Sequence, residues 1–259
     1  MGTIRRLTVA AVAAVVLAIS SLLPAFALTD QQQWELQVGQ QQFRQLQQQG
    51  KIVSSSPDYA LLNPIAHRIA GVANTKYFAP FHFILVRDSS PNAFAVPGGN
   101  VYVTTAMMTF AKNREELAGV LCHETSHTIH HDVYNLARKN QTLGLAAGIV
   151  GMLIGQNAGW AQSLISMGAG LQSLSFSREV ESAADHTGAY TCAAAGENPW
   201  GMVWLFKRFQ TKPSSVPLEM LSDHPRDDHR VTDLENLFAT DHTTFDRFSS
   251  NAANATPLR

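Results

Sequence analysis

Apolar residues recur with helical spacing in the middle of the chain, and one such run is followed directly by a cluster of polar residues that begins at His123. The run 117–122 is followed by His123, and Asn113 stands three residues before Glu116. That pair matches a capping box, in which two side chains satisfy the first backbone N–H groups of a helix. The pattern therefore predicts a helix that begins just after Asn113. Its end is left open, because residues 128–138 could continue it.

Two further helices are predicted before this one. The glutamine-rich segment 31–49 carries an apolar stripe at helical spacing, which favours an amphipathic helix over a prion-like polar tract. A second helix is predicted from about Tyr59 to Gly71. The stripe on the first helix consists of Leu36, Gly39, Phe43 and Leu46.

Short runs rich in β-branched and aromatic residues, separated by turn residues, predict a small sheet before the central helix. The predicted strands are 81–86, 93–96 and 101–104. His82, in the first of them, is interpreted as a histidine packed in the core rather than as a metal ligand. The chain is therefore predicted to be an α+β protein, mostly helical with a small three-stranded sheet.

Composition narrows the class of protein. With 259 residues, of which 45% are hydrophobic, the chain can bury a full core as one domain. The formal net charge is −1 and there is no basic stripe, so no nucleic acid is expected as a partner. The cysteines, Cys122 and Cys192, are too few for a disulfide framework.

The N-terminal segment has the pattern of an export signal. An arginine pair precedes the apolar run 7–23, and an A-x-A cleavage pattern ends at Ala27. This predicts a signal peptide over 1–27 and a single domain over 28–259, exported to the periplasm or another extracytoplasmic compartment. An uncleaved N-terminal anchor is the alternative, since the run is nearly long enough to span a bilayer. The arginine pair also leaves twin-arginine export open.

The most specific chemical signal is the H-E-x-x-H pattern of His123, Glu124 and His127. Histidines four residues apart on a helix project from one face, with the spacing that two ligands of one zinc ion need. Glu124 lies about 100° round the helix, where it could reach a water at the metal and act as general base. The third histidine of a metzincin is missing, so the third ligand has to come from elsewhere in the chain.

Glu181 and Asp185 are the candidates further along. They are four residues apart, so on a helix both carboxylates face the same way. A carboxylate completes the usual site of two histidines and one glutamate, and an aspartate one turn on could accept the ring N–H of a ligand histidine. Cys192 lies about 16 Å beyond Glu181 along such a helix, so it is predicted to stay unpaired with Cys122.

The segment 142–171 is almost free of charge and rich in glycine. Gln156-Asn157 divides it into halves that are each too short to span a bilayer. It is therefore predicted to form an apolar helical hairpin, packed on the protein or in contact with a membrane surface. An odd number of membrane crossings is excluded, because the candidate ligands lie on both sides of the segment.

Taken together, the motifs resemble the gluzincin metallopeptidases that include HtpX, BepA, the mitochondrial Oma-type proteases and the CAAX prenyl proteases. The resemblance covers roughly Gln31 to Leu237. The motifs that carry it are His123-Glu124-x-x-His127, Ser177-Arg178-x-x-Glu181-x-x-x-Asp185-x-x-Gly188, Asn92-Ala93-Phe94 with Gly98-Gly99, and His224-Pro225 followed by Arg230.

The resemblance implies a zincin-like metalloprotease domain that binds one catalytic Zn²⁺ ion. The implied metal ligands are His123, His127 and Glu181, with Glu124 as general base. Asp185 and Arg230 are then expected around the ligands. His224 is expected near the metal, where it stabilises the oxyanion or occupies the open position.

The resemblance also implies how substrate is held. An extended peptide is expected to pair with the strand that contains Asn92, Ala93, Phe94 and Ala95. Two residues depart from the family pattern: Ala106 replaces a common glycine and Asp132 replaces a common histidine. Neither belongs to the implied ligand set.

The expected function is a zinc-dependent metalloendopeptidase that hydrolyses extended or misfolded polypeptides of the cell envelope, in protein quality control. The alternative is a zinc-bound, chaperone-like factor with little proteolysis. Glu124, which is intact in this sequence, favours the enzyme.

Overall fold

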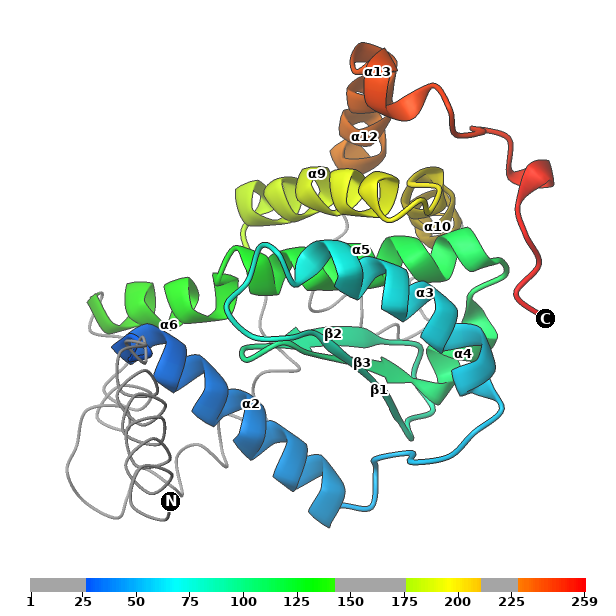
Figure 1. Ribbon diagram of the computed structural model, residues 1–259. Coiled ribbons are helices and arrows are strands. Elements are labelled where there is room, and N and C mark those ends of the chain that lie inside the picture. The colour runs from blue at the N-terminus through cyan, green and yellow to red at the C-terminus, as the bar shows by residue number, and fades with distance from the viewer. Residues whose placement is uncertain (1–26, 143–175, 211–227) are drawn as a thin grey trace, which may run out of the picture. The chain divides into compact units, whose positions relative to one another are not determined.

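The computed structural model describes residues 27–142, 176–210 and 228–259 (Figure 1). The chain divides into two compact units, 1–33 and 34–259, and the second contains the sheet and the helices around it. Most of the predicted signal peptide, nearly all of the predicted hairpin 142–171 and His224 lie outside the described residues. Among the helices that are described, none combines the length and the apolar character needed to cross a bilayer.

The α+β class is confirmed, and each predicted strand lies within one residue of its observed bounds. The strands are β1 (His82–Val86), β2 (Ala93–Val96) and β3 (Asn100–Thr104). The described helices are α2 (Asp30–Gln48), α3 (Asp58–Ala73), α4 (Thr105–Phe110), α5 (Arg114–Ile129), α6 (Asp132–Thr142), α9 (Arg178–Ala194), α10 (Trp200–Gln210), α12 (Asp228–Thr240), α13 (His242–Phe245) and the 3₁₀ helix η2 (Ala252–Asn254).

The sheet is mixed, with strand order β1-β3-β2. β3 pairs with β1 in parallel and with β2 in antiparallel fashion. The turn from β2 to β3 passes through Gly98 and Gly99, whose φ angles of 91° and 94° favour glycine. Because β3 is the central strand, β1 and β2 are both edge strands and lie on opposite sides of it.

Each face of the sheet is covered by helices. Leu85, Val101 and Val103 point to the face where α3 and α5 pack, as members of the largest apolar cluster. Val38 and Leu46 of α2 pack on the other face, against a cluster that includes Phe94 and Tyr102 of the sheet. Figure 1 shows α3 and α5 above the sheet and α2 below it.

The central helix α5 is buried on all sides between the sheet, α3, α9 and α10. Its predicted start is confirmed, since the Asn113 side chain accepts a hydrogen bond from the N–H of Glu116 at 2.7 Å. The helix ends at Ile129 and does not continue to residue 138. His131 adopts a left-handed φ of 58°, and α6 begins at the next residue, Asp132.

Two local predictions are wrong in detail. His82 is exposed rather than packed in the core, because β1 is an edge strand and its first residue lies beyond the helices that cover the sheet. On α2 the buried face includes Glu35 and Gln42, so it is rotated from the predicted apolar stripe. Of that stripe, Gly39 and Leu46 are buried, whereas Leu36 and Phe43 are only half-buried.

Candidate metal centre

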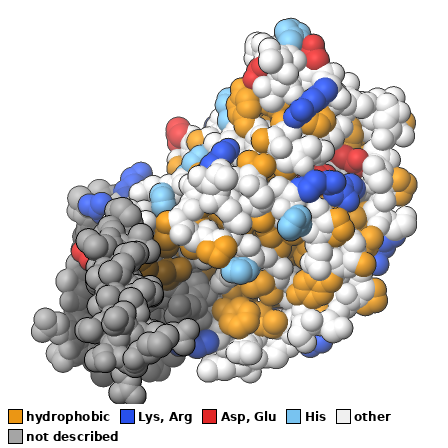
Figure 2. Space-filling model, in the orientation of Figure 1, with side chains coloured by type: hydrophobic (Ala, Val, Ile, Leu, Met, Phe, Trp, Pro, Cys, Tyr) orange, Lys and Arg blue, Asp and Glu red, His pale blue; other side chains and the backbone are white. Residues whose placement is uncertain are grey.

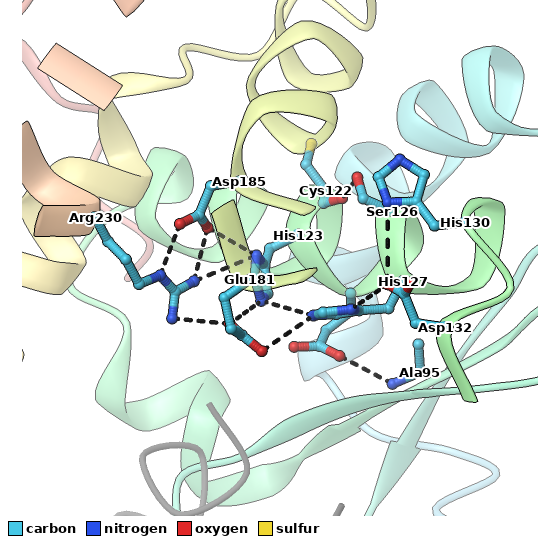
Figure 3. A network of polar contacts seen from close by, with 11 residues as sticks. Ala95, Cys122, His123, Ser126, His127, His130, Asp132, Glu181, Asp185 and Arg230 are labelled. Atoms are coloured by element: carbon cyan, nitrogen blue, oxygen red, sulfur yellow. Dashed lines mark hydrogen bonds and ion pairs between the residues drawn. The ribbon is translucent and has the colours of Figure 1, made fainter. Parts of the chain in front are cut away.

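Three buried side chains from two helices meet at one point (Figure 3). His123 and His127 lie on successive turns of α5, and Glu181 lies on the first turn of α9. Their ligand atoms are all within 4.8 Å of one another. The two Nε2 atoms are 3.1 Å apart, and oxygens of Glu181 lie 3.5 Å from that of His123 and 3.7 Å from that of His127. The fold thus brings together the three residues expected to hold a metal.

Close packing of α9 on α5 makes this meeting possible. A Cβ atom at Gly188 of α9 would lie 3.2 Å from both the Cα and the backbone nitrogen of His123. Such contacts are tighter than side chains normally tolerate, so the glycine lets the two helix backbones approach at the level of the site. This accounts for Gly188 in the motif that follows Glu181.

Each histidine is oriented through its other ring nitrogen. Asp185 has a carboxylate oxygen 2.9 Å from Nδ1 of His123, and Asp132 has one 2.8 Å from Nδ1 of His127. A carboxylate accepts the ring N–H at Nδ1, which leaves the lone pair on Nε2. Two such lone pairs facing each other at 3.1 Å would repel unless a cation lies between them. The donor set, with a third ligand from a carboxylate, therefore fits Zn²⁺.

The electrostatics of the site agree with a bound cation. Burial lowers the pKa of His123, but the hydrogen bonds of Asp185 and Glu181 outweigh it and hold that pKa above its ordinary value. The same negative surroundings that favour a proton on the imidazole favour a metal ion between the rings.

Arg230 of α12 ties the two carboxylates of α9 together. It makes two hydrogen bonds of 2.7 Å to Asp185 and lies 3.0 Å from a carboxylate oxygen of Glu181. Burial raises the pKa of Asp185, but the charge and hydrogen bonds of Arg230 bring it below its usual range. The guanidinium also lies 4.2 Å from the ring centre of Phe206. Arg230 thereby fixes the carboxylate that orients His123 and the one expected to bind metal.

Glu124 joins the metal centre to the sheet. It is buried, and one carboxylate oxygen accepts a hydrogen bond of 3.0 Å from the backbone N–H of Ala95. Because Asn92 and Thr104 share a hydrogen bond across β2 and β3, the alternation of an antiparallel ladder turns Ala93 and Ala95 outward. The free edge of β2 therefore runs beside Glu124.

The other two residues expected to contact substrate face β3 instead. Asn92 is buried, and its N–H donates to the hydroxyl of Thr104 at 2.9 Å. Phe94 stacks on Tyr102 with ring centres 5.1 Å apart. Of the residues 92–95, only Ala93 and Ala95 present backbone groups at the free edge.

Asp132 is a site residue that sequence reasoning missed. Its contact with His127 depends on the break at His131, after which a new helix begins and Asp132 lies against the His127 ring. The signal in the sequence was its position, five residues after His127 and directly after a histidine pair. Phe176 was missed as well; its ring stacks on His127 at 4.6 Å.

Cys122 and Cys192 form a disulfide, so the prediction that they stay unpaired is wrong. Their Cα atoms are 5.7 Å apart. The error came from measuring along α9 from Glu181, whereas α9 lies along α5 and Gly188 already sits over Cys122 and His123. One further turn of α9 carries Cys192 to Cys122. The bond joins the two helices that bear the candidate ligands.

Comparison with known proteins agrees with this geometry. The family model described as "Peptidase family M48" matches residues 59–238. The "Beta-barrel assembly-enhancing protease" of Yersinia pestis is 31% identical over 212 residues, which are 78% of this chain and 43% of that protein. "Mitochondrial metalloendopeptidase OMA1" of Schizosaccharomyces pombe is 25% identical over 169 residues, 64% of this chain and 48% of that protein.

A third relative matches over more of its own length. "Protease HtpX" of Legionella pneumophila is 28% identical over 216 residues, which are 73% of each chain. The present chain spans less than half the length of the assembly-enhancing proteases that it matches, at 43%. The residues matched by the family model contain the H-E-x-x-H helix, Glu181 and Arg230.

Proposed function

Because the chain belongs to peptidase family M48, we propose that it is a zinc-dependent endopeptidase that cleaves extended or misfolded polypeptides in protein quality control. One observation carries this proposal: Glu124 lies between the three candidate ligands and the free edge of a β-strand. A general base is thereby placed where an extended peptide backbone could be held.

His123, His127 and Glu181 would hold the zinc ion. When bound, zinc polarises the scissile carbonyl and lowers the pKa of the attacking water. Asp185 and Asp132 keep the two imidazole rings in the tautomer that offers Nε2.

Glu124 acts as general base and then as general acid. Its carboxylate takes a proton from the attacking water and delivers it to the leaving amine. The N–H of Ala95 holds one oxygen of that carboxylate, so the orientation of Glu124 depends on β2. His224 is proposed, from the resemblance alone, to stabilise the oxyanion or to occupy the open position at rest.

Substrate is bound by its backbone. The N–H and C=O of Ala93 and the C=O of Ala95 point away from β3 and can pair with an extended chain without reading its side chains, whereas the N–H of Ala95 holds Glu124. This suits clients that share unfolded character rather than a sequence. Protein or peptide substrates are thus proposed, and no nucleic acid partner.

We place this activity in the cell envelope. The export pattern over 1–27 supports it, and so does the disulfide, since disulfides persist in oxidising compartments. The relatives named for β-barrel assembly suggest clients among envelope proteins. Contact of the segment 142–171 with a membrane surface remains part of the proposal.

The proposal is tested by separating metal binding from cleavage. We expect Glu181→Ala to lose most of the zinc that co-purifies with the protein, because it removes a ligand. Glu124→Gln should keep zinc and lose casein cleavage by about 10²–10⁴-fold, because it removes only the proton carrier. Zinc is measured by atomic emission and cleavage by release of labelled fragments, with a chelator arm for the wild type.

Glu179→Gln serves as the matched control, since Glu179 is an exposed carboxylate on the same turn as Glu181. It should keep both zinc and activity. Stoichiometric zinc in an active Glu181→Ala variant would refute the ligand set. A wild type that binds unfolded casein and never cleaves it would favour the chaperone-like factor.

A further inference from the structure

A groove of about 930 Å³ lies on the β1 side of the sheet, the side opposite β2. Its walls are α2, which contributes Phe43 and Arg44, and α3, which contributes His67. His82 and Phe83 of β1 lie between these walls. Since β3 separates β1 from β2, this groove is distinct from the edge that runs beside Glu124.

Part of the β1 backbone opens into the groove. In a parallel pair, alternate residues direct both N–H and C=O to the neighbouring strand. The His82 N–H donates to the carbonyl of Gly99, whereas the Leu85 carbonyl accepts from Val53, outside the sheet. Phe83 lies two residues before Leu85, so its N–H and C=O point in the same direction, away from β3 and toward the groove.

The chain itself starts to cover this edge and then leaves it. Residues 51–53 run antiparallel to β1, with a bridge between Ile52 and Val86. The chain then turns away into α3, and within the described residues no backbone pairs with Phe83. Residues 51–53 therefore cover the outer edge of β1 only at its C-terminal end. The groove lies along the rest of that edge, where a further strand could pair.

The charged side chains around the groove are all basic, and the rest are apolar or neutral amides. Phe43 and Phe83 are half-buried, while Arg44, His67 and His82 are exposed. Among the described residues, none that lines the groove is acidic. The side chains of Arg44, His67 and His82 make no hydrogen bond or ion pair with any described residue. Figure 2 shows hydrophobic and histidine side chains in the middle of this view, with acidic ones nearer its periphery.

We propose that this groove binds an extended peptide segment with acidic and apolar side chains, as an additional strand on β1. The outward backbone of Phe83 supplies ladder hydrogen bonds, and the two helices meet the alternating side chains of the guest. Arg44 is a permanent cation, which selects acidic residues in the guest. The groove and the β2 edge can be occupied at the same time, so this is a second peptide site beyond the proposed catalysis.

The test is a binding measurement that does not depend on proteolysis. The probe is a fluorescein-labelled hexapeptide of alternating valine and glutamate, and its partner control has lysine in place of glutamate. Both are titrated by anisotropy against protein that carries Glu124→Gln, so that neither is cleaved. The acidic peptide should bind, more weakly as salt is raised, and the basic one should not.

Two pairs of variants locate the site. Arg44→Glu should weaken binding about tenfold, whereas Lys112→Glu, a charge reversal outside the groove, should not change it. Phe83→Pro should bind about three- to tenfold more weakly than Phe83→Ala, because both lose the ring but only proline loses the N–H. Circular dichroism checks that each variant is folded.

Three results would overturn the proposal: no saturable binding of the acidic peptide, equal binding of the basic one, or an unchanged affinity in Arg44→Glu. Because Arg44 is exposed, that variant is expected to fold and the comparison stays decisive. Casein cleavage is not measured in this assay. A negative binding result would therefore leave the proposed protease activity standing, and absence of protease activity would leave the proposed peptide site standing.

Discussion

Asp132 illustrates how much a single carboxylate can matter when it orients a metal ligand. It is buried, and one of its carboxylate oxygens lies 2.8 Å from Nδ1 of His127. Partners of this kind typically change metal affinity by about 10–100-fold when they are removed. We therefore expect Asp132→Ala to bind zinc about 10–100-fold more weakly than wild type, in a competition assay with a fluorescent chelator.

The matched control for that prediction is Asp246→Ala. Asp246 is exposed, and among the described residues its side chain pairs with His242, four residues away, so its loss should leave zinc affinity unchanged. An Asp132→Ala variant with wild-type affinity would show that the ring of His127 is held by its packing on Phe176 instead.

At the scale of helices, the close approach of one helix backbone to another depends on glycine at the point of contact. A Cβ atom at Gly201, in the first turn of α10, would collide with the backbone of Glu115 in α5. Backbone cannot move aside as a side chain can, so α10 would have to shift. We expect Gly201→Ala to lower the free energy of unfolding by about 1–3 kcal/mol or more in urea.

Gly71→Ala is the control for that variant. Gly71 lies in α3, and a Cβ atom there would meet nothing within 4 Å. Alanine is the better helix former by about 0.8–1.0 kcal/mol, so Gly71→Ala should be neutral or stabilising. Equal destabilisation by both variants would contradict the prediction, because it would mean that close packing of α10 on α5 is not what makes alanine unfavourable at Gly201.

The disulfide belongs to the same scale, because it joins α5 to α9. Cys122 and Cys192 are 70 residues apart, and in the chain-entropy account a loop of that length is worth about 4 kcal/mol. The double variant Cys122→Ala/Cys192→Ala should therefore unfold at lower urea concentration than oxidised wild type. Wild type under reductant should lose stability as well.

Mass spectrometry after alkylation of the unfolded, unreduced protein gives an independent check. The wild type should take up no alkylating groups before reduction and two after it. Uptake of two groups without reduction would restore the original expectation of free thiols.

Local signals in the sequence predicted the elements well, and contacts between distant segments explain what they missed. Asn113 and Glu116 fixed the start of α5 because a capping box is complete within four residues. The break after α5 could not be predicted in the same way. His131 is held in its left-handed conformation where its ring contacts Glu35, at 2.6 Å, and Glu35 comes from α2.

In the candidate site too, features set by local sequence could be predicted, and features set by contacts between distant segments could not. The meeting of His123, His127 and Glu181 could be predicted because helical spacing and motif order are properties of the sequence itself. Asp132 and the disulfide could not, since both depend on how α5 is approached by its neighbours. The groove beside β1 likewise follows from the path of residues 51–53, which no local pattern specifies.

For the molecule as a whole, the metal centre links regions that are far apart in the chain. His127 and Glu181 come from helices separated by the segment 142–171, and Arg230 adds a third helix. An unfolded chain does not hold these residues together, so metal binding must favour the folded state. By linkage, a ligand present at about 1,000 times its dissociation constant stabilises a protein by about 4 kcal/mol.

We therefore expect a chelator to lower the thermal midpoint of the wild type and of Glu124→Gln by a similar amount. Glu181→Ala should start from a low midpoint and respond little to chelator, because it has already lost most of its metal. Differential scanning fluorimetry with and without added zinc measures all three. The comparison distinguishes a ligand from a proton carrier without any substrate, since both residues are buried carboxylates beside the same histidines and only one of them is expected to bind metal. A chelator response that persists in Glu181→Ala would place the stabilising metal elsewhere in the chain.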